Sequence, residues 1–127
     1  MVNIESLLQY AQPEKIDLGE YEEDRLGFIL PNGLICVNGK APLEEQVKTV
    51  LHEIIHLAPE FRTYNEGCWN KTITRKERVE EKIESHAQEI YRTRPDVVKV
   101  IEERLAAAAL DPRNKPEKVE EVKYRRN

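Results

Sequence analysis

The chain has 127 residues, of which 39% are apolar and 35% are charged, and its net charge is −4. This length fits one domain with one core and argues against two independent domains, each of which would be marginal. A duplex-binding protein normally carries a concentrated basic face, so the acidic balance leads us to expect no nucleic-acid partner.

The sequence also gives an expectation about the compartment. The first five residues lack the basic stretch and the apolar run of a signal peptide. The longest wholly apolar stretch, Leu105 to Leu110, is far too short to span a bilayer. We therefore expect a cytoplasmic protein with no membrane partner.

The first third of the chain predicts one helix and a β-hairpin. Asn3 is a suitable N-cap for a helix that continues to about residue 12. Residues 13–24 are polar, and we expect them to be irregular. Two apolar runs, residues 26–30 and 34–38, predict strands joined by a Pro-Asn-Gly turn. Together they predict a short antiparallel sheet.

The remainder of the chain predicts three helices, over about residues 42–58, 75–93 and 96–110. In the first two, apolar residues recur at helical spacing, so one face of each helix packs on a core. Residues 60–75 have the composition of a loop. The fold class is therefore α+β.

The division into domains follows from the same pattern. We expect one domain over residues 1–110, in which the sheet packs on the helix at 42–58 and on the helix that follows it. Residues 111–127 are polar, and we expect them to form a mobile C-terminal tail.

His52 and His56 lie four residues apart on the predicted helix at 42–58, so both imidazoles project from one face, one turn apart. This geometry suits two ligands of one tetrahedral Zn²⁺. Glu53 follows the first histidine, where its carboxylate can reach a metal-activated water without binding the metal. It would act as general base and then as general acid. The alternative interpretation is a surface helix with two incidental histidines.

A catalytic zinc site needs a third protein ligand and one open position. Arg62 stands where a histidine-extended motif would have its third histidine, so the donor is expected among the glutamates of the next helix. The candidates there are Glu80, Glu81 and Glu84. Glu80 and Glu84 share a face beside the buried stripe, whereas Glu81 points further toward solvent. We favour Glu80 as the metal ligand and Glu84 as the second-layer carboxylate that accepts the free N–H of a ligand histidine.

These motifs resemble those of the gluzincin metallopeptidases, and among them the ImmA/IrrE-like and minigluzincin families. The resemblance covers about residues 26–95. It rests on the strand at 34–38 followed by the His52-Glu53-Ile54-Ile55-His56 helix, and on Glu80-x-x-Ile83-Glu84-x-x-Ala87 downstream. It implies a small zincin-like domain that binds one Zn²⁺ per chain. The implied activity is endopeptidase cleavage of a peptide or protein substrate, which in some members is a single regulatory protein.

Other roles stay open at the level of the sequence. Tyr64, His86 and Tyr91 are candidates for stabilising the oxyanion of the reaction. Trp69 either lines the cleft or packs its loop on the core. The strand at 34–38 is either an edge that pairs with an extended substrate or an interior strand.

Two further alternatives concern the protein as a whole. The C-terminal tail could fold back into the cleft and hold the enzyme latent, as the resemblance to minigluzincins suggests. The alternative function is a catalytically inactive zinc-binding module of the same fold, with a regulatory or protein-interaction role.

Overall fold

The computed structural model describes residues 2–20, 27–61 and 73–114. These residues form an α+β fold, as predicted, with three short 3₁₀ segments in the described ranges and one strand that the sequence did not predict. The elements are α1 (Ile4–Leu7), η1 (Leu8–Ala11), η2 (Pro13–Lys15), β1 (Ile16–Gly19), β2 (Gly27–Ile29), β3 (Ile35–Asn38), α2 (Leu43–Ile55), α4 (Ile73–Thr93), α5 (Pro95–Ala109) and η4 (Pro112–Asn114).

The sheet has three strands in the order β1-β3-β2. The predicted hairpin is confirmed, because β2 pairs with β3 in antiparallel orientation. The prediction of a purely antiparallel sheet is wrong, because β1 pairs with β3 in parallel and makes the sheet mixed. Residues 16–19, expected to be irregular, form this strand. β3 is the central strand, so the edge alternative for residues 34–38 is also wrong.

The helices agree with the apolar periodicity, with differences at their ends. Asn3 caps α1 as predicted, since its side chain accepts a hydrogen bond from the Ser6 N–H. The α-helix ends at Leu7, however, and the chain continues to Ala11 as a 3₁₀ helix. Pro42 is the N-cap of α2. Such shifts of a turn or less leave the helix faces as predicted.

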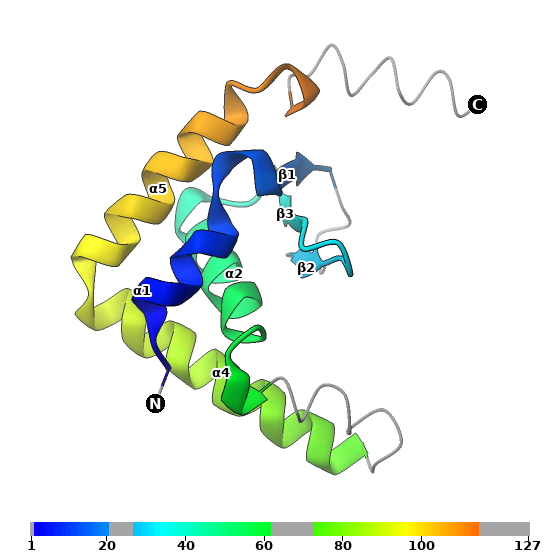
Figure 1. The fold of residues 1–127 in the computed structure, drawn as a ribbon, viewed down its shortest axis with the longest axis vertical. Helices are drawn as coiled ribbons and strands as arrows, with labels where there is room; N and C mark the ends of the chain where they lie inside the picture. The colour runs from blue at the N-terminus through cyan, green and yellow to red at the C-terminus, as the bar shows by residue number, and fades with distance from the viewer. Residues whose placement is uncertain (1, 21–26, 62–72, 115–127) are drawn as a thin grey trace.

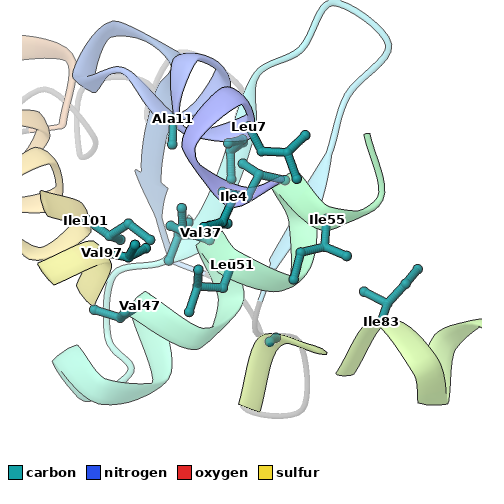
Figure 2. Packing of buried hydrophobic residues seen from close by; sticks show 14 of the residues in the cluster. Ile4, Leu7, Ala11, Val37, Val47, Leu51, Ile55, Ile83, Val97 and Ile101 are labelled. Carbon is teal, nitrogen blue, oxygen red and sulfur yellow. The ribbon is translucent and has the colours of Figure 1, made fainter. Parts of the chain in front are cut away.

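α2 is the centre of the domain, and it contacts α1, β3, α4 and α5. In Figure 1 it lies in the angle between α4 and α5, with the sheet beyond it. Its buried side chains join one continuous core with those of the sheet and the other helices, labelled in part in Figure 2. Fully buried members include Val37, Leu51, Ile54, Ile83 and Ile101. This packing holds α2 and α4 at one spacing.

Gly27 lets β2 approach α2 closely. A Cβ at this position would lie 2.5 Å from both the Cys36 carbonyl oxygen and Thr49 Cγ2. A larger residue here would push the strand from the helix.

Residues 112–114 lie within the segment predicted as a tail, yet they contact the sheet. The Asn114 carboxamide accepts a hydrogen bond from the Leu18 N–H at 2.9 Å and donates to the Ala108 carbonyl oxygen, also at 2.9 Å. The rest of the predicted tail, residues 115–127, lies outside the described residues. Within the described part of the chain, no helix has the length and apolar character needed to cross a membrane.

Candidate metal centre

Two consecutive turns of α2 carry the histidine motif. Leu51, Ile54 and Ile55 are fully buried on one side of this segment. This apolar side orients the helix and turns His52 and His56 toward α4. The exposed fractions of the two imidazole side chains are 21% and 15%, so both are partly shielded from water. His56 is the C-cap of the helix, where its backbone N–H bonds to the His52 carbonyl.

α4 supplies the carboxylates from the face beside its own buried stripe. Ile83 is fully buried, and Glu80 and Glu84 share the face of α4 beside it, so the burial of Ile83 turns both glutamates toward α2. Both glutamates keep part of their surface in water, with 42% and 48% of each side chain exposed.

Three side chains converge at one point. His52 Nε2 lies 2.9 Å from Glu80 Oε2 and 3.3 Å from His56 Nε2. His56 Nε2 lies 3.2 Å from Glu80 Oε1. Ligands bound tetrahedrally to Zn²⁺ at 2.0–2.1 Å stand about 3.3 Å from one another. The distances to Glu80 involve both of its carboxylate oxygens. One ligand atom from each of the three residues lies within 4.8 Å of the other two, and this donor triangle could hold a metal ion.

Glu84 contacts the other nitrogen of the first histidine. Its Oε2 lies 2.7 Å from His52 Nδ1, on the opposite side of the ring from Glu80. A carboxylate in this position favours the tautomer with the proton on Nδ1, which leaves Nε2 free for a metal. This is the contact that the sequence predicts for Glu84.

Glu53 is the buried carboxylate of the motif, with 8% of its surface exposed. Burial raises the pKa of Glu53, and the positive charge of His56 and His52 opposes this rise. A carboxyl group whose pKa lies nearer to neutrality is better suited to accept and return a proton. Glu53 is not among the three residues that converge.

The charges of the cluster are strongly coupled. Burial acts to lower the pKa of His52, but hydrogen bonds to Glu80 and Glu84 outweigh it and raise this pKa to about 8. The same hydrogen bond from His52, with that from His56, holds the pKa of Glu80 well below its usual range. A metal ion that bound here would compete with the proton of His52, because a histidine ligand has to be neutral.

The other candidates from the sequence lie elsewhere or outside the described residues. The His86 ring packs edge-on against Phe61, with centroids 5.7 Å apart, and the Tyr91 ring lies under Lys48 Nζ at 5.0 Å. Glu81 is exposed and does not belong to the metal group found among the described residues. Tyr64 and Trp69 lie outside the described residues. The oxyanion roles of Tyr64, His86 and Tyr91 stay predictions.

Gln88 is a residue that sequence reasoning missed. Its Nε2 donates to Glu84 Oε1 at 3.0 Å, which ties it to the cluster through Glu84. The spacing of four residues between Glu84 and Gln88 was the available signal, because residues four apart are neighbours on a helix.

Comparison of the chain with protein-family models, with curated proteins and with solved structures gives no match. The metal centre is therefore inferred from the arrangement of His52, His56 and Glu80 across α2 and α4 alone.

Proposed function

We propose that the protein is a zinc-dependent endopeptidase in which His52, His56 and Glu80 bind the metal. The observation that carries the proposal is the convergence of two histidines and one glutamate, with ligand atoms within 4.8 Å of one another, in a motif that also holds the buried carboxyl group of Glu53. Two histidines and one glutamate are a ligand set of known catalytic zinc sites, which leave one coordination position open. The resemblance to gluzincins supports the same reading.

The proposed reaction is hydrolysis of a peptide bond in a peptide or protein substrate. A bound Zn²⁺ supplies Lewis-acid activation of a water molecule and of the substrate carbonyl. Glu53 takes a proton from the attacking water as the water oxygen forms a bond to the carbonyl carbon. It then donates that proton to the leaving nitrogen as the C–N bond breaks. Glu84 holds His52 in the tautomer that the site requires.

The proposal is tested with Glu53→Gln, which removes the base and keeps the shape of the side chain. We expect zinc to be retained and kcat toward an unfolded protein substrate to fall by roughly 10²- to 10⁴-fold, as for loss of a general base. Glu45→Gln is the matched control, because it makes the same change earlier in the same helix and should leave kcat unchanged.

Two results would contradict the proposal in different ways. Full activity in Glu53→Gln would exclude Glu53 as the base. A wild-type protein that binds zinc at these residues but cleaves no peptide bond would favour the inactive zinc-binding module instead.

A further inference from the structure

The contacts of Glu84 continue beyond the histidine that it orients. One carboxylate oxygen, Oε2, faces His52 Nδ1 at 2.7 Å. The other, Oε1, accepts a hydrogen bond from Gln88 Nε2 at 3.0 Å. Both oxygens of one carboxylate therefore have partners, and the three residues form a chain that leads from the surface of α4 to the donor triangle.

From this chain we infer that Gln88 is a positioning residue of the metal centre. Glu84 has 48% of its side chain exposed, so water competes for its oxygens and several rotamers are open to it. The Gln88 amide favours the rotamer in which Oε2 meets His52 Nδ1. It thereby helps to keep the His52 ring in the orientation that aims Nε2 at the metal, as outer hydrogen-bond partners do in metal sites.

The surroundings of Gln88 separate this role from a role in folding. The side chain is exposed and lines an open groove of about 350 Å³ between α2 and α4. Methionine has nearly the same length and shape as glutamine and lacks the donor. Gln88→Met therefore removes the hydrogen bond to Glu84 without filling a packed space.

Zinc affinity measured by chelator competition is the first test. Loss of an exposed hydrogen bond should weaken binding about three- to tenfold in Gln88→Met. Glu84→Ala should weaken it about 10- to 100-fold. Because Gln88 acts through Glu84, adding Gln88→Met to Glu84→Ala should cause no further loss. Gln9→Met, the same change at an exposed position on η1, should bind zinc as the wild type does.

Affinities in Gln88→Met equal to the wild type would overturn the inference. The inference would also be overturned if Gln88→Met weakened zinc binding by the same factor in the wild type and in Glu84→Ala, because the effect would then not pass through Glu84.

A second measurement does not depend on zinc. The inference rests on the proposed metal centre only for the predicted change in zinc affinity, since the hydrogen bonds exist in the metal-free protein. Exchange of the His52 Nδ1 proton with water, followed by NMR on metal-free protein, should become several-fold faster in Gln88→Met and faster still in Glu84→Ala. An unchanged exchange rate in Gln88→Met would refute the positioning role. A wild type that shows this pattern but binds no zinc would refute the proposed function and leave the positioning role standing.

Discussion

Two clusters of the molecule have the same pattern of charges and different chemistry. In the first, His52 lies between Glu80 and Glu84, at 2.9 and 2.7 Å. In the second, Arg94 lies between Glu5 and Asp96, at 2.6 and 3.0 Å. Each places one basic side chain between two carboxylates, and each links elements that are far apart in the sequence.

The difference lies in the basic partner and its neighbours. The Arg94 guanidinium has no lone pair to offer a metal and does not lose its proton in proteins. The hydrogen bonds to Asp96 and Glu5 raise its pKa further above the usual value. The His52 imidazole loses its proton near pH 8 and then has a nitrogen lone pair, with a second histidine 3.3 Å away. Contact between opposite charges therefore does not distinguish the two clusters. A donor that can lose its proton beside further donors does distinguish them, because such a group could hold a metal ion.

The largest effect is expected from the packing that supports the first cluster. Ile83 is fully buried between the two glutamates of α4. Ile83→Ala should lower the free energy of unfolding of the metal-free protein by about 2–5 kcal/mol, measured by urea denaturation, because it leaves a cavity beneath α4. It should also weaken zinc binding, since the spacing of α2 and α4 sets the donor triangle.

Leu110→Ala is the control for this change. Leu110 is 76% exposed at the end of α5, so truncation there should cost little stability. If Ile83→Ala and Leu110→Ala lost equal amounts of unfolding free energy and of zinc affinity, the α2–α4 contact would have no special part in holding the cluster.

The next largest effect concerns the donor set of the first cluster. Glu80→Ala removes a donor and should weaken zinc binding by more than about 100-fold, beyond the loss expected for an outer-layer partner. Glu81→Ala makes the same change at the neighbouring exposed position, and it should retain zinc in elemental analysis. Loss of zinc in Glu81→Ala, with zinc retained in Glu80→Ala, would show that Glu81 is the third ligand and that the assignment to Glu80 is wrong.

The smallest effect is expected at the second cluster. Arg94→Met should leave zinc binding unchanged and lower the melting temperature slightly, because surface ion pairs contribute little. The hydrogen bonds from Arg94 hold the pKa values of Glu5 and Asp96 below their ordinary values of 4.5 and 3.8. A carboxyl group whose pKa is lowered in the folded state stabilises the fold at pH values above its ordinary pKa. This stabilisation is lost as the pH falls through the pKa of the folded state.

The difference in melting temperature between wild type and Arg94→Met should therefore be present at neutral pH and vanish in acid. A difference that persisted at pH 2 would mean that Arg94 stabilises the protein by packing its aliphatic stem instead.

The parts of the fold that the sequence predicts are those decided by local geometry. The faces of α2 and α4 follow from apolar residues at helical spacing, and residues four apart on a helix are necessarily neighbours. For this reason the positions of His52, His56 and Glu80 on facing sides of two helices were predictable. Choosing Glu80 over Glu81 needed only the position of Ile83 on the buried stripe.

The parts that were missed depend on contacts between distant segments. β1 is four residues long, and its pairing partner β3 is parallel to it. Its outer edge bonds to Asn114, which lies 96 residues after Leu18. No local pattern encodes such a strand. The 3₁₀ continuation of α1 is likewise a feature of packing. The contact of Gln88 with Glu84 is different, because the spacing of four residues made it predictable although their side-chain rotamers decide whether it forms.

X-ray absorption at the zinc edge, on protein loaded with one equivalent of zinc, tests the metal centre most directly. We expect one zinc per chain with only nitrogen and oxygen neighbours at about 2.0–2.1 Å, two of them imidazoles, and loss of one imidazole in His56→Ala. Sulfur neighbours at about 2.3 Å, or a spectrum that His56→Ala leaves unchanged, would contradict this expectation.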